Sequence, residues 1–230
     1  MGSTKIVLAH RGLDQLPPKP ARDSMPALPN SPPTEGPGVG SPRPVRLLSV
    51  GRLVPKKGHI HQLVACALLK SWGVPFVARI VGDGPLDDDL QRRITRDGLE
   101  EFVSLTGPLA PQQVDEQYLW VDVFWHTGVV DAEGDRDGIP NVIPEAFARC
   151  LPVISSRTAG PMEAVAHEVT GLLVEPSNTA ELAGAVKRLA DDPALREQLG
   201  EAGRHWAEEN FLITRNAAIL ARAFREACGQ

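Results

Sequence analysis

The sequence lacks a long apolar run, an excess of positive charge and a cysteine framework. No stretch approaches the ~20 apolar residues that span a bilayer, and the opening residues show no small-residue cleavage site of a secretory signal. The net charge of −5 leaves no broad basic surface for nucleic acid. Cys66, Cys150 and Cys228 are too widely spaced for a disulfide framework or a zinc site. We therefore expect a cytoplasmic protein with reduced thiols, without a metal or cofactor and without a nucleic-acid partner.

What is present is the composition of a globular protein and one segment of a different kind. Hydrophobic residues make up 42% of the chain and charged residues 23%. Residues 15–44 hold ten of the 21 prolines, and such a segment cannot form regular backbone hydrogen bonds. The sequence thus predicts a short N-terminal piece (1–14) with one strand-like run, a flexible linker (15–44) and a folded domain (45–230).

Short apolar runs alternate with helical patterns throughout the folded domain. We predict strands at 45–50, 76–81, 102–106, 121–126, 152–155 and 172–174, and helices at 86–97, 111–120, 141–149, 161–167, 179–191, 193–210 and 212–227. A further helix begins near residue 59, and its apolar residues at the 3.6 period predict one buried face of Ile60, Leu63, Val64, Ala67 and Leu68. This alternation predicts an α/β fold with a doubly wound, Rossmann-like parallel sheet.

Ligands of such a sheet bind beyond the carboxyl ends of its strands, which here precede the loops 51–58, 82–86, 107–110, 127–140 and 156–161. In the first of these loops, GRLVPKKG, Arg52 follows Gly51 and Lys57 lies at the mouth of the next helix. An arginine fork and a lysine point charge can hold a diphosphate without metal, together with helix N–H groups. A solvated, positively charged loop is the alternative.

The second loop, IVGDGP, carries Gly82 and Gly84 but fails as a dinucleotide fingerprint, because Asp87 stands where the third glycine would be. It still provides a tight turn that lets backbone approach a ligand closely.

A long acidic segment, DAEGDRDG, leads into IPNVIPEAF. Its first acids, Asp131, Glu133 and Asp135, fit a solvated loop. Asp137 and Glu145 stand eight residues apart around a Gly–Ile–Pro turn, which would direct backbone N–H groups of residues 138–143 into the crevice. For these two acids we favour a functional role.

Two further patterns are discounted as sites. Asp87, Asp88 and Asp89 resemble the D-x-D of metal-dependent transferases, but they fit better as the first turn of a helix, where acids favour the positive helix end. His59 and His61 cannot share a helix face, and we expect both at the surface.

The order of five motifs resembles the C-terminal domain of the retaining group 1 glycosyltransferases, which have the two-domain GT-B architecture. These motifs are GRLVPKKGH, IVGDGP, DGIPNVIPEAFARCLPVISS, AGPMEAV and TGLLVEP, and the colanic-acid type is the most similar branch. The resemblance covers residues 45 to about 212 in collinear order.

The resemblance implies a nucleotide-sugar (NDP-sugar) donor and a role for each matching residue. Arg52 and Lys57 would neutralise the donor diphosphate, Asp137 would lie near the donor sugar, and Glu145 would hydrogen-bond the nucleotide ribose. The remaining donor-binding positions would be Gly51, Gly82, Gly84, Gly138, Ile139, Pro140, Asn141 and Val142. Catalysis would fall to Asp137, Arg52 and Lys57, without a metal ion.

The sequence departs from the family pattern at several positions. Asp137 replaces a glutamate, Trp125–His126 replaces a Leu–Pro-like pair, Arg149–Cys150 replaces Cys–Gly, and Glu168 replaces a glycine. If position 150 requires a left-handed backbone, a non-glycine residue there costs roughly 1–2 kcal/mol.

The function that follows is retaining sugar transfer in which a missing N-terminal domain holds the acceptor, a saccharide or a lipid. The intact enzyme would associate peripherally with a membrane. Two alternatives stay open: a nucleotide-sugar-binding or interaction module without turnover, and, more weakly, a nucleotide-sugar epimerase of the same fold.

Overall fold

The computed structural model describes residues 16–17, 43–212, 217–218, 221 and 225. The N-terminal piece 1–14, most of the linker 15–44 and most of the expected helix 212–227 lie outside these residues. No helix within the described part of the chain is both long and apolar enough to cross a bilayer.

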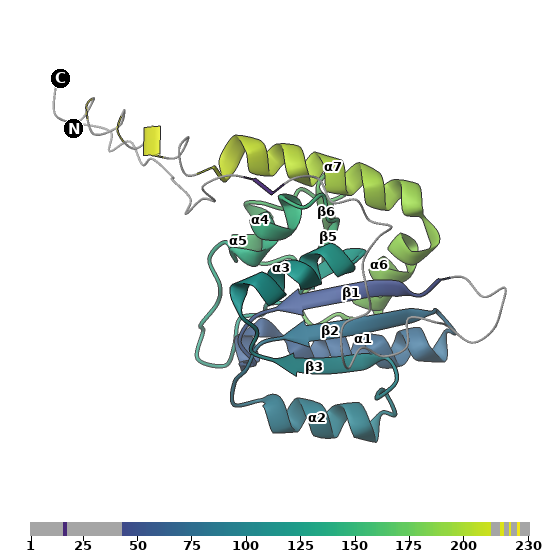
Figure 1. Ribbon diagram of the computed structural model, residues 1–230. Coiled ribbons are helices and arrows are strands. Elements are labelled where there is room, and N and C mark those ends of the chain that lie inside the picture. The colour runs from purple at the N-terminus through teal and green to yellow at the C-terminus, as the bar shows by residue number, and fades with distance from the viewer. Residues whose placement is uncertain (1–15, 18–42, 213–216, 219–220, 222–224, 226–230) are drawn as a thin grey trace.

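The core of the fold is one sheet of six parallel strands, in the order β3-β2-β1-β4-β5-β6 (Figure 1). The strands are β1 (Val45–Val50), β2 (Phe76–Val81), β3 (Val103–Gly107), β4 (Val123–His126), β5 (Val153–Ser156) and β6 (Gly171–Val174). Every residue of β2, β4, β5 and β6 is buried, as continuous apolar runs require when helices cover both faces. The predicted doubly wound, Rossmann-like α/β fold is confirmed.

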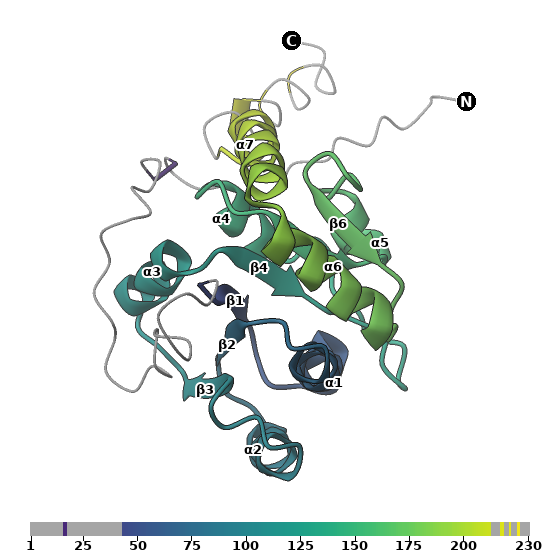
Figure 2. The same ribbon diagram turned by 90° about the vertical axis from the view of Figure 1, so that its right-hand side faces the viewer.

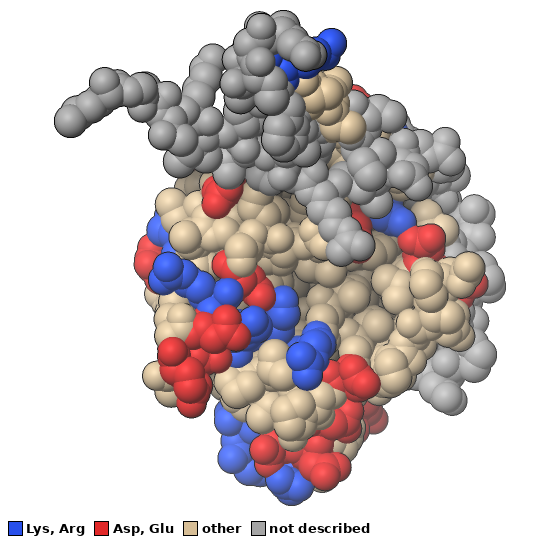
Figure 3. Space-filling view, turned by 90° about the vertical axis from the view of Figure 1, so that its left-hand side faces the viewer, with Lys and Arg blue, Asp and Glu red and all other residues tan. Residues whose placement is uncertain are grey.

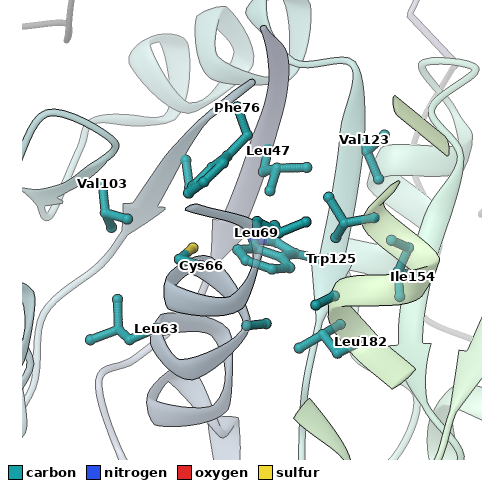
Figure 4. Packing of buried hydrophobic residues seen from close by; sticks show 14 of the residues in the cluster. Leu47, Leu63, Cys66, Leu69, Phe76, Val103, Val123, Trp125, Ile154 and Leu182 are labelled. Carbon is teal, nitrogen blue, oxygen red and sulfur yellow. The ribbon is translucent and has the colours of Figure 1, made fainter. Parts of the chain in front are cut away.

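Helices cover both faces of this sheet (Figure 2). They are α1 (His59–Ser71), α2 (Asp87–Arg96), α3 (Pro111–Trp120), α4 (Val142–Phe147), α5 (Ala159–Met162), α6 (Thr179–Asp191) and α7 (Pro193–Asn210). Neighbouring residues of β1 point to opposite faces: Leu47 packs with side chains of α1, α2 and α6, and Leu48 with side chains of α3 and α4. Figure 4 shows the first of these two cores, with Leu47 and Leu69 close to Trp125.

The buried face of α1 differs from the expected one. Ile60 is 38% exposed, and the buried side of the helix is formed by His59, Gln62, Leu63, Ala65, Cys66 and Leu69. The apolar pattern alone predicts the wrong face, because two residues of the buried face are polar. His59 and Gln62 are buried as a hydrogen-bonded pair, with 3.0 Å between His59 Nδ1 and Gln62 Oε1.

The expected helix at 161–167 is also corrected, since α5 covers Ala159–Met162. Pro161 fits only the first turn of a helix, so the helix begins before it. Glu163 is consequently the C-cap residue of α5.

Candidate functional site

The strand order places a crevice between two loops that are distant in the sequence. The chain runs from β1 through β2 to β3, and then returns to place β4 on the other side of β1. The loops after β1 and β4 therefore diverge at one point of the carboxyl edge, where doubly wound sheets bind ligands. Figure 3 views this edge: Lys, Arg, Asp and Glu side chains gather beside a hollow with a mostly uncharged surface.

Backbone contacts fix these two loops against each other. The loop after β1 forms a 3-10 turn at Pro55–Lys57 and ends at Gly58, with φ of 66°. Thr127 Oγ1 lies 3.0 Å from the Gly58 carbonyl oxygen, and the Val129 N–H donates to the Lys56 carbonyl at 2.8 Å. A Cβ at position 58 would stand 2.0 Å from the Thr127 oxygen. Only glycine allows this approach, which sets the place from which the Lys57 side chain leaves the loop.

Lys57 and Asp137 meet across the crevice. Lys57 Nζ donates to Asp137 Oδ2 at 2.7 Å, and both side chains are largely buried. Lys56 lies farther from this carboxylate, at 3.9 Å, and pairs with Asp135 at 2.8 Å. Burial alone would raise the pKa of Asp137, but its contacts with His126 and Lys57 outweigh burial and lower the pKa to about 2. Asp137 is therefore an ionised acceptor at neutral pH.

His126 belongs to this site, although in the sequence it stands out only as a departure from the family pattern. It ends β4 and is 3% exposed, and its Nε2 lies 3.3 Å from Asp137 Oδ2. The contact lacks good hydrogen-bond geometry, and both ring nitrogens are buried without a hydrogen bond. Burial lowers the pKa of His126 more than Asp137 raises it, so the ring is neutral. The signal that could have found it is its place at the carboxyl end of a central strand.

The expectation of surface histidines is wrong for His59. The side chain is 2% exposed, and its Nε2 lies 3.2 Å from the Arg52 carbonyl oxygen. The buried imidazole therefore contacts the backbone of the loop that is predicted to bind the diphosphate. His61, by contrast, is partly exposed and contacts Ser177.

The glycines of the second loop are required by contacts between loops. The Leu53 N–H donates to the Asp83 carbonyl at 2.7 Å. A Cβ at Gly82 would stand 2.0 Å from the Gly51 oxygen, and one at Gly84 would stand 2.5 Å from the Leu53 oxygen. Both glycines have positive φ, 140° and 155°. The close approach that we expected toward a ligand is thus, in this structure, an approach of one loop to another.

Arg52 and Glu145 lie outside the Lys57–Asp137 contact. Arg52 is exposed on the loop after β1. Glu145, in α4, accepts a hydrogen bond from the Tyr118 hydroxyl of α3 at 3.1 Å. Burial raises the pKa of Glu145, and the Tyr118 hydrogen bond and the Arg149 charge oppose this shift only in part.

The turn between Asp137 and Glu145 presents only some of the expected backbone donors. Gly138 is exposed, and a Cβ there would meet no atom within 4 Å, so this side of the residue is open, whereas its carbonyl oxygen lies close to Gly160. Pro140 has no N–H, and the Ile143 N–H already donates to the Pro140 carbonyl at 3.0 Å. Asn141 is exposed, whereas Ile139 and Val142 are half-buried and pack against the core.

The remaining acids of the long loop lie in a hydrogen-bonded turn, which the Asp135–Lys56 pair also joins to the loop after β1. Asp131 accepts hydrogen bonds from the backbone N–H groups of Glu133 and Asp135, at 3.1 and 2.9 Å. Across the described ranges, no three His, Cys, Asp or Glu side chains gather where they could hold a metal ion.

Comparison with known proteins identifies the family. The family model of the group 1 glycosyl transferases matches residues 40–206. The amylovoran biosynthesis glycosyltransferase AmsK of Erwinia amylovora is 38% identical over 170 residues, which are 74% of this chain and 42% of AmsK. The putative colanic acid biosynthesis glycosyltransferase WcaL of Escherichia coli is 37% identical over 194 residues, 80% of this chain and 48% of WcaL.

Solved structures give the same result. Anabaena HepE in complex with UDP superposes with a TM-score of 0.71 at 25% identity, over 80% of this chain and 49% of HepE. HepE is also known in complex with UDP-glucose, with a TM-score of 0.68 at 27% identity. The chain spans about half the length of the curated relatives that it matches. From its matched motifs and its fold, the chain belongs to the group 1 glycosyltransferases.

Proposed function

We propose that this chain is the donor-binding half of a retaining, metal-independent glycosyltransferase and that it binds an NDP-sugar at the carboxyl edge of its sheet. The observation that carries the proposal is the meeting of Lys57 and Asp137, from the loops after β1 and β4, at the point where the strand order reverses. The UDP and UDP-glucose complexes of the similar protein HepE support a nucleotide-sugar donor.

Lys57 and Arg52 would hold the diphosphate of the donor. An ammonium group has three donor hydrogens, so Lys57 can keep its bond to Asp137 and still donate to a phosphate oxygen. Arg52 is exposed on the same loop and can turn toward the second phosphate. Charge on the departing diphosphate increases during transfer, and fixed cations that stabilise it would be the largest catalytic contribution of this half.

Asp137 would bind the donor sugar. Its low pKa keeps it ionised, so it can accept hydrogen bonds from sugar hydroxyls. Because aspartate is one methylene shorter than glutamate, the sugar would have to lie closer to the loop. Glu145 would accept a hydrogen bond from the ribose, and the open side of Gly138 leaves room there for part of the donor.

The acceptor would be bound by a part of the enzyme outside this chain. A saccharide or lipid acceptor would be held by an N-terminal domain that faces the carboxyl edge, and its hydroxyl would attack the anomeric carbon on the side of the leaving group. Peripheral membrane association of the intact enzyme would bring a lipid acceptor within reach.

The test is calorimetric titration of the purified chain with UDP, GDP and ADP and with their sugars, followed by incubation with labelled donors. Binding together with transfer or hydrolysis supports an enzyme. Binding without turnover favours the nucleotide-sugar-binding module, and an epimerised sugar product indicates an epimerase. Failure of every nucleoside diphosphate to bind overturns the proposal.

A further inference from the structure

The chain has a single tyrosine, Tyr118, and its hydroxyl is placed against Glu145. The side chain is 1% exposed and comes from α3, while Glu145 comes from α4. The hydroxyl lies 3.1 Å from Glu145 Oε2 and 3.4 Å from the Val142 carbonyl oxygen. A phenol has one hydrogen to donate, and the nearer, charged carboxylate is the stronger acceptor.

The tyrosine ring is held in this orientation from two sides. Phe124 of β4 packs against one side, with 5.7 Å between the ring centroids. The guanidinium of Arg149 lies 4.6 Å from the centroid of the Tyr118 ring. Arg149 is itself fixed, since it donates to the Glu145 backbone carbonyl at 2.8 Å and forms an ion pair with Asp115. The hydroxyl therefore cannot follow Glu145 if that side chain changes rotamer.

One oxygen of the Glu145 carboxylate is thus occupied, and its direction is set by a rigid donor. Within the described ranges, no other side chain donates to this carboxylate. The second oxygen remains for a ligand, and a carboxylate with one oxygen fixed can present the other only in a narrow range of directions. Tyr118 also favours the ionised form of Glu145 against burial, and only that form accepts with both oxygens.

We propose that Tyr118 is a positioning residue for Glu145: its hydroxyl holds one carboxylate oxygen and thereby directs the other at a ribose hydroxyl of a nucleoside diphosphate. This inference rests on the proposed function and deepens it. It predicts that the chain distinguishes ribonucleotides from deoxyribonucleotides, and that the distinction depends on a residue that need not touch the nucleotide.

The experiment compares UDP with 2′-deoxy-UDP and 3′-deoxy-UDP, and GDP with its corresponding deoxy forms, on the wild-type chain and on Tyr118→Phe. We expect the wild type to prefer the ribonucleotide over one deoxy form by about tenfold or more, as for a hydrogen bond to a charged group. In Tyr118→Phe this preference should fall to about twofold or less, because the ribonucleotide binds more weakly while the deoxy form binds as before. Unchanged binding of the deoxy form also shows that the variant is folded.

A second variant changes the other residue of the same contact. Glu145→Gln should lose the preference as well, and Tyr118→Phe should have no further effect in that background, since the two residues act through one contact. Ser71→Ala removes a hydroxyl from an exposed hydrogen bond at the end of α1 and should leave the preference intact. A further readout is the ring signal of selectively labelled tyrosine, which comes from Tyr118 alone and should shift more with UDP than with the deoxy form.

The outcomes separate this inference from the proposed function. If a wild-type chain that binds nucleoside diphosphates keeps its full ribose preference in Tyr118→Phe, the positioning role is wrong and the donor site stands. If wild type binds no nucleoside diphosphate, both are overturned.

Discussion

Lys57 and Asp137 are 80 residues apart in the sequence, and their side chains are joined by a 2.7 Å hydrogen-bonded ion pair at the carboxyl edge of the sheet. The exposed fraction of each side chain is below one fifth, so solvent screens the pair less than it screens a surface pair. The His126 Nε2 atom lies 3.3 Å from the same carboxylate. The cation that the proposed function assigns to the diphosphate is therefore already fixed in place before a ligand arrives.

Removal of either cation should weaken nucleotide binding. We expect Arg52→Ala and Lys57→Ala each to reduce the binding free energy of a nucleoside diphosphate by about 1–3 kcal/mol, the size of one charge-assisted contact. Lys57→Ala should also lower the free energy of unfolding, because it leaves the Asp137 carboxylate with only the more distant Lys56, at 3.9 Å. Arg52→Ala should leave stability nearly unchanged, since that side chain is exposed.

Titration calorimetry and urea unfolding provide the two measurements. Lys187→Ala serves as the control, because Lys187 is half-exposed and pairs only with Asp191 on the surface of α6. Equal nucleotide affinity in wild type and in both variants would contradict the phosphate assignment.

Most of the fold could be predicted from the sequence because parallel, buried strands are continuous apolar runs. The bounds of β1, β2, α3, α6 and α7 match the predicted ranges. The face of α1 could not be predicted, because periodicity counts apolar residues and cannot detect that His59 and Gln62 satisfy each other in the core.

The sequence predicted where in the fold the candidate site lies, but not which side chains contact one another there. The topology rule indicated five loops at the carboxyl edge, the motifs placed Lys57 and Asp137 in two of them, and the structure brings these two side chains together. The partners of Glu145 and Asp137, which are Tyr118 and His126, depend on side-chain directions across neighbouring elements. No spacing within one sequence carries that information.

The two buried histidines predict a loss of stability at mildly acidic pH. Burial lowers the pKa of His59 and of His126 below the ordinary value of 6.5. Below pH 6.5 the unfolded chain therefore binds protons that the folded chain does not bind, so the free energy of unfolding falls as the pH falls. The slope can reach about 1 kcal/mol per pH unit for each histidine.

Urea unfolding followed by tryptophan fluorescence between pH 7.5 and about 5 measures this slope. His126→Asn should reduce it, because one of the three histidines whose pKa is lowered by burial, His59, His61 and His126, is removed from the proton balance. His205→Asn should not reduce it, since His205 is exposed on α7. A free energy of unfolding that stays constant over this range would contradict the burial of both neutral rings.

Two glycine substitutions of the same kind should have opposite effects. In Gly82→Ala, the new Cβ would stand 2.0 Å from the Gly51 oxygen at a φ of 140°, so the loops after β1 and β2 must separate. We expect destabilisation by about 2 kcal/mol or more. In Gly184→Ala, the new Cβ lies in open space within α6, and alanine should stabilise the helix by up to about 1 kcal/mol. Thermal unfolding of both variants tests the comparison, and equal signs would contradict it.

Glu168 occupies a left-handed backbone position that favours glycine. Its φ is 62°, and its side chain is exposed and pairs only with Arg188 on the surface. Glycine removes the conflict between Cβ and the backbone, and the exposed ion pair that is lost contributes little. We expect Glu168→Gly to raise the melting temperature by about 2 °C. Glu163→Gly is the matched control, because Glu163 is also exposed but has a right-handed φ of −73°, where glycine only increases the entropy of the unfolded chain. If scanning calorimetry shows that both variants melt below wild type, the strain assigned to position 168 is absent, and the glutamate there is held by contacts stronger than its surface pair.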